Sequence, residues 1–130
     1  MFYKESKKNI QQTKHKIMSK FDEKVALYKQ FMDDRNLRSN TELLAAVTKG
    51  LGPSIYKADA ETVSGSDAKE LATVKNNFLI KKLGLEDSPA LDEGIAEVIE
   101  RIGKSERKKY RAVVYYMLMK KFDKESVYGF

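Results

Sequence analysis

The chain has no cysteine and a single histidine, His15, so residues 18–130 contain neither of these residue types. That absence excludes from residues 18–130 zinc sites built on Cys and His, Ser-His-Asp and Cys-His catalysis, and haem ligation by His or Cys. The five methionines are scattered at positions that suit core packing better than binding of a soft metal. We therefore expect no metal, no cofactor and no catalytic residue, and the balance of motifs is against an enzyme.

Long apolar runs are also missing. The longest, Ala112 to Met119, is far shorter than the roughly 18 residues that a membrane-spanning helix needs. The N-terminus is basic but lacks the apolar core of a secretory signal. Small secreted domains often need disulfides, which this chain cannot form. The sequence thus predicts a cytoplasmic protein that makes no use of a membrane.

The net charge of +6 is concentrated at one end of the chain. Residues 1–17 hold five lysines and one acid, Glu5, and so account for +4 of that charge. Helical periodicity begins only after Ser19, which forms a capping-box pattern with Asp22. We interpret residues 1–17 as a basic flexible arm or an upstream extension, and residues 18–130 as a single helical domain.

Segments of helical periodicity, each bounded by a capping residue and a stop, follow one another along residues 19–122. The last of them carries the string AVVYYMLM, which is apolar nearly all round, as expected of a helix at the centre of a bundle. No segment shows convincing strand alternation. The sequence predicts a compact all-α single-domain bundle of about five helices around a central C-terminal helix. The expected helices are 19–35, 40–49, 66–84, 88–102 and 105–122.

The connection at 50–66 is rich in glycine and in small hydroxylated residues. Gly52-Pro53 predicts a turn, followed by a short helix that would place Ile55 and Tyr56 against the core. Further on, Ser64-Gly65-Ser66 precedes a helix and could offer backbone N–H groups to an anion, although Asp67 would repel one. We interpret the stretch first as a connection between helices. The alternative is a small-ligand or anion site at 52–67, with Ser54, Tyr56, Asp59, Ser64 and Ser66 as its residues.

A run of basic residues surrounds Tyr110 near the start of the last predicted helix. Such a cluster could bind nucleic acid or an acidic partner, because lysine and arginine hold phosphates and a tyrosine ring can stack on a base. Tyr110 also shares a helical face with Val113 and Met117, which favours a place in the core. The candidate residues of this surface are Lys104, Arg107, Lys108 and Arg111.

Several long strings of the sequence are specific enough for comparison: GPSIY with Ala58-Asp59, TVSGSD from Thr62, VKNNFLIKKLGL from Val74 and KYRAVVYY from Lys109. These strings resemble a small bacterial family, the domain of unknown function numbered 2853. The resemblance covers residues 18–128 and implies a short single-domain protein, with no activity or site residue to carry over. Our leading hypothesis is therefore a non-enzymatic binding or interaction module, with a protein partner or a second copy of the chain as its candidate partner.

Overall fold

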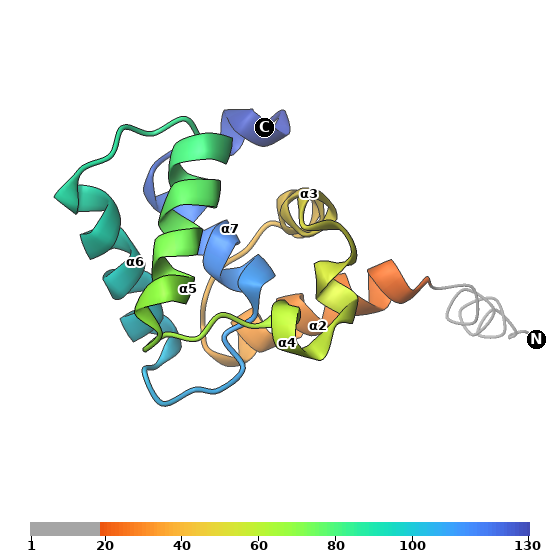
Figure 1. The fold of residues 1–130 in the computed structure, drawn as a ribbon. Coiled ribbons are helices and arrows are strands. Elements are labelled where there is room, and N and C mark those ends of the chain that lie inside the picture. The colour runs from red at the N-terminus through yellow and green to blue at the C-terminus, as the bar shows by residue number, and fades with distance from the viewer. Residues whose placement is uncertain (1–18) are drawn as a thin grey trace, which may run out of the picture.

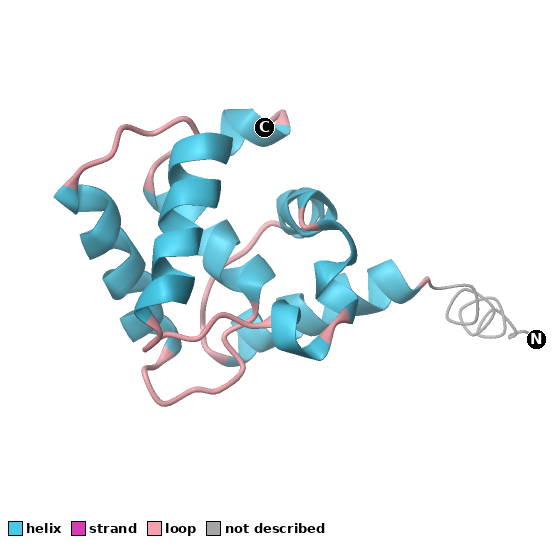
Figure 2. Ribbon diagram, in the orientation of Figure 1, coloured by secondary structure: helices cyan, strands magenta, loops and turns pink. Residues whose placement is uncertain are grey.

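The computed structural model describes residues 19–130, so the predicted basic arm at 1–17 lies outside the described residues (Figure 1). Over the described part of the chain, helices are joined by loops and no strand forms (Figure 2). The predicted all-α single-domain bundle is confirmed. Its elements are α2 (Lys20–Asp34), α3 (Thr41–Gly50), η1 (Gly52–Tyr56), α4 (Ala58–Glu61), α5 (Ala68–Thr73), η2 (Val74–Lys82), α6 (Pro89–Ile102), α7 (Arg111–Lys121) and η3 (Glu125–Tyr128).

The first helices begin at the residues that the capping patterns indicate. Ser19 forms a complete capping box with Asp22 at the start of α2, and the Asn40 side chain accepts a hydrogen bond from the Leu43 N–H at the start of α3. The third predicted helix begins one residue later than expected. Its cap is Asp67, not Ser66, because the Asp67 carboxylate accepts the Lys69 N–H at 3.0 Å.

The prediction of a helix from Ser105 is wrong, since α7 starts only at Arg111. The preceding residues, 104–110, form a loop that pairs with the end of the 50–66 connection. The Val63 N–H donates to the Lys109 carbonyl at 2.8 Å, and Thr62 and Tyr110 form an isolated antiparallel bridge. This pairing takes up backbone groups that a longer α7 would need for its own first turn.

The segment after α5 continues as η2, a π-helix, which helical periodicity could not distinguish from an α-helix. It buries Val74, Phe78 and Leu79. The Phe78 ring stacks on Tyr115 of α7, with the ring centroids 3.9 Å apart and the planes 17° from parallel. This stacking joins the widened helix to the centre of the bundle.

The predicted central position of the last helix is confirmed. All residues from Ala112 to Met119 are buried, and α7 contacts α2, α3, α4, α6 and η2. In Figure 1 it lies among the other helices. None of the helices in residues 19–130 has the length and apolar character needed to cross a membrane.

Candidate functional site

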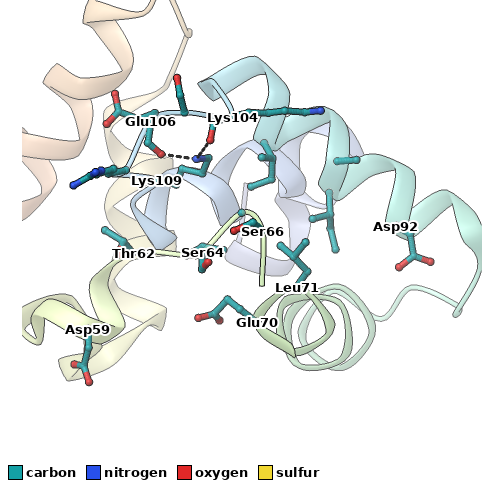
Figure 3. A pocket seen from close by; sticks show the side chains of 17 residues that line it. Asp59, Thr62, Ser64, Ser66, Glu70, Leu71, Asp92, Lys104, Glu106 and Lys109 are labelled. Atoms are coloured by element: carbon teal, nitrogen blue, oxygen red, sulfur yellow. Dashed lines mark hydrogen bonds between the residues drawn. The ribbon is translucent and has the colours of Figure 1, made fainter. Parts of the chain in front are cut away.

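A groove of about 830 Å³ lies where three chain segments meet. Its walls are the 62–66 loop running into α5, the exposed side of α6, and the 104–109 loop (Figure 3). The pairing of Val63 with the Lys109 carbonyl holds two of these walls together. The apolar part of the lining comes from Val63, Leu71, Ile95, Ala96 and Ile99.

The predicted ligand residues separate into two groups. Asp59, Ser64 and Ser66 line the groove. Ser54 does not, and its hydroxyl donates to the Leu51 carbonyl at 3.1 Å within the η1 turn. Tyr56 also lies outside the lining. The expectation that its ring packs against the core is wrong, because it is 49% exposed.

The basic cluster is divided in the same way. Lys104 and Arg107 line the groove, whereas Lys108 is exposed and does not contribute to the lining. Tyr110 is buried, as its helical face predicts, and its ring lies 4.9 Å from that of Tyr28. Burial raises the pKa of Tyr110 above its ordinary value. Its ring is therefore not available to stack on a base.

Arg111, the fourth member of the cluster, points into the protein and binds the connection. Its Nε donates to the Ala60 carbonyl at 3.0 Å, and its guanidinium lies 3.2 Å from the Glu70 carboxylate and 3.4 Å from the Thr62 carbonyl. Burial alone would lower the pKa of Arg111, but its hydrogen bonds to Tyr115 and Glu70 raise it. Arg111 thus fixes the position of the groove wall that begins at Thr62.

Lys109 belongs to the predicted basic cluster and lines the groove, although it was not among the candidate binding residues. Only 4% of it is exposed, and its Nζ donates to the carbonyls of Lys104 and Glu106 (Figure 3). These two hydrogen bonds hold the backbone of the 104–109 loop around the Lys109 side chain. In the sequence Lys109 is one of several neighbouring basic residues, and no pattern there distinguishes a buried lysine from solvated ones.

Glu106 joins the same loop to α2. Its carboxylate accepts the Lys108 N–H at 2.9 Å and forms an ion pair with Arg35, whose guanidinium lies 3.7 Å from the centre of the Phe31 ring. The backbone hydrogen bond from Lys108, followed by the side-chain bond from Arg35, holds the pKa of Glu106 below its ordinary value. The Glu106 carboxylate is therefore ionised at neutral pH.

The acids around the groove mostly have basic partners. Glu70 pairs with Arg111, Glu106 with Arg35, and Asp92 with Lys75 at 3.1 Å. In residues 19–130, Asp59 is the lining acid for which no ion pair forms. No group of three or more His, Cys, Asp or Glu side chains in this range could hold a metal ion.

Gly65 lets the groove walls approach each other. A Cβ at this position would lie 3.1 Å from both the Ile99 Cγ2 and the Lys109 Cε atoms, which is too close for ordinary packing. Because both neighbours are buried, we expect Gly65→Ala to lower the free energy of unfolding by about 1 kcal/mol and Gly65→Val by about 2 kcal/mol. Urea denaturation followed by circular dichroism measures both values.

Gly50→Ala is the matched control for that prediction. A Cβ there would meet only the Tyr128 ring, at an ordinary contact distance of 3.7 Å. The position lies within α3, where alanine favours the helix, so this variant should be as stable as the parent or slightly more stable. If Gly65→Val were equally harmless, the close approach at the groove would have no energetic importance.

Comparison with known proteins gives one family. The model of the family described as "Protein of unknown function (DUF2853)" matches residues 27–126, and the resemblance drawn from the sequence is thereby confirmed. No curated protein matches the chain. All residues that line the groove fall within the matched stretch.

Proposed function

We propose that this chain, which belongs to the DUF2853 family, is a non-enzymatic binding module whose ligand occupies the groove. The observation that carries the proposal is the way in which the groove is built. It brings residues from the 50–66 connection and from the basic cluster, far apart in the sequence, to the walls of one cavity.

The size and lining of the groove support a small ligand. Pockets for small molecules measure roughly 300–1,000 Å³ and combine an apolar surface with a few polar groups. Here the apolar surface comes from α6, α5 and Val63, and the polar groups include the Ser64 and Ser66 hydroxyls, basic side chains of the 104–109 loop and acids that are mostly ion-paired. The groove therefore offers both the contact area and the polar contacts that orient a ligand.

The arrangement of these groups favours binding over catalysis. A serine nucleophile needs a base within hydrogen-bonding reach. In the part of the chain that the structure describes, the Ser64 and Ser66 hydroxyls form no hydrogen bond with a basic side chain, and Glu70 is held by Arg111. The proposal therefore involves no chemical step.

The test is to block the groove from α6, where Ala96 is exposed and lines the cavity. We expect NMR titration of the labelled full chain with small acids, amines and neutral molecules to shift the Ser64–Ser66 amides and the Ile95 and Ile99 methyl groups saturably. Ala96→Phe should weaken that binding at least tenfold by occupying the space, a loss of about 1.4 kcal/mol. Ala90→Phe, exposed on the same helix but outside the lining, is the matched control.

Two results would contradict the proposal. One is an absence of saturable shifts at the groove for every class of molecule, or binding that is indifferent to Ala96→Phe. The other is salt-sensitive binding of mixed RNA or DNA that survives Ala96→Phe but is lost when Lys104, Arg107 and Lys108 become glutamine. The second result would assign function to the basic surface instead of the groove.

A further inference from the structure

We infer that the ligand carries an anionic oxygen, from a carboxylate or a phosphate, which binds the Lys109 Nζ. This inference rests on the proposed function and specifies the class of ligand. Its basis is a buried ammonium group that forms no direct ion pair within the described part of the chain.

Lys109 has a donor to spare. An ammonium group has three N–H bonds, and the carbonyls of Lys104 and Glu106 accept two of them. In residues 19–130 no third acceptor is found for the Lys109 Nζ, although the residue is only 4% exposed. A buried donor without an acceptor is unfavourable, and more so when it is charged.

Lys109 also forms no direct ion pair with any described residue, although its charge helps to lower the pKa of Glu106. Among residues 19–130, no carboxylate lies within 4.0 Å of its Nζ. Glu106 is the nearest acid in the same loop, but its oxygens are taken by Arg35 and by the Lys108 N–H. Buried charges in proteins are normally paired or coordinated, so a ligand anion would supply the missing partner.

Three of the four acids that line the groove are ion-paired, so the charged groups left without an ion pair in the described part of the chain favour an anion over a cation. Ser64 and Ser66 line the same groove on either side of Gly65, which lies against the Lys109 side chain, and a serine hydroxyl can donate to an anion (Figure 3). Lys104 and Arg107 add positive charge to the same wall. Asp59, the lining acid without an ion pair, lies apart from Lys109 in Figure 3.

The apolar residues of the groove lining indicate the chemical character of the rest of the ligand. Val63, Leu71, Ile95 and Ile99 also line the groove, and a bare anion such as inorganic phosphate would leave their accessible parts in contact with water. A ligand with a short apolar portion would cover them, and the burial of its CH₂ groups would add to the affinity. The ligand class is thus an anionic head group on a short apolar body.

The decisive comparison uses probes that differ only in the head group. The full chain is titrated at pH 7 with hexanoate, hexyl phosphate and the neutral hexanamide, while groove signals are followed by NMR. Charge-assisted hydrogen bonds are stronger than neutral ones, so we expect at least one of the anions to bind at least tenfold more tightly than hexanamide. Which anion binds better decides between a carboxylate and a phosphate ligand.

The possible failures are distinguishable. If hexanamide binds the groove as well as the anions do, the inference is overturned while the proposed binding function stands. If neither anion binds in the groove but a neutral or cationic molecule does, the inference is again overturned alone. If no class of molecule binds there, both the inference and the proposed function fail.

Lys109 itself is tested in two ways. Lys109→Met keeps most of the side chain but removes the ammonium, and it should abolish the preference for an anion if the variant folds. Because two carbonyls lose their donor, it could fail to fold, so the second test uses the unchanged protein. There the ¹⁵Nζ signal of Lys109 should shift saturably with the anion, whereas that of Lys29, which donates to the Ser39 carbonyl, should not. An unmoved Lys109 signal with the anion bound would contradict the inference.

Discussion

Leu118→Ala is expected to lower the free energy of unfolding by about 4 kcal/mol. Leu118 has no exposed surface and lies in α7, the helix that contacts most of the others. Its truncation would remove buried methyl groups and leave a cavity that the surrounding helices cannot easily fill. Because small domains have a total stability of about 5–15 kcal/mol, this loss should be evident in urea denaturation and as a markedly lower Tm.

Leu27→Ala provides the matched control, since it is the same substitution on α2 at a side chain that is 41% exposed. We expect it to change the free energy of unfolding by no more than about 0.5 kcal/mol. A cost below about 1 kcal/mol for Leu118→Ala would mean that α7 is not the centre of a tightly packed core.

The central place of α7 could be predicted from the sequence because it depends on composition alone. A helix that is apolar on all sides must be surrounded by other elements, and the AVVYYMLM string allows no exposed face. The starts of α2, α3 and α6 could also be predicted from the sequence, because caps such as Ser19 and a proline at the first helical position act locally.

The start of α7 could not be predicted, because it is decided by contacts between distant segments. Ser105 offers a plausible cap, but the carbonyls of Lys104 and Glu106 bind the Lys109 ammonium and Val63 pairs with the Lys109 carbonyl. Local propensity for a helix is small compared with such tertiary pairing. A lysine that turns inward gives no signal in a hydrophobic pattern.

Parts of the candidate site could be predicted from the sequence, but the groove that they form together could not. From the sequence, the 52–67 connection and the 104–111 cluster were competing alternatives, because about 40 residues separate them. The fold places Ser64 and Ser66 from one, and Lys104 and Arg107 from the other, in the lining of the same groove. It also withdraws Arg111 from the surface, which distinguishes the residues that could meet a ligand from those that hold the groove together.

Arg111→Met should cost about 3 kcal/mol of unfolding free energy, the second-largest effect that we expect. The Arg111 side chain is 13% exposed, and methionine can replace part of the packing of its stem. The substitution would nevertheless leave the Ala60 and Thr62 carbonyls without their donor and Glu70 without its partner. Losses of this kind are large because partly buried polar groups pay for desolvation and gain nothing in return.

Arg107→Met is the matched control, because Arg107 is exposed and should tolerate the change within about 0.5 kcal/mol. A double-mutant cycle with Glu70→Gln then isolates the ion pair. Removal of the acid relieves the unpaired charge in the Arg111→Met background, so the two substitutions together should cost less than the sum of their separate effects. Additive costs would show that Arg111 acts mainly through the carbonyls of the connection. In either case the wall of the groove that starts at Thr62 depends on a basic residue that the sequence presents as part of a binding surface.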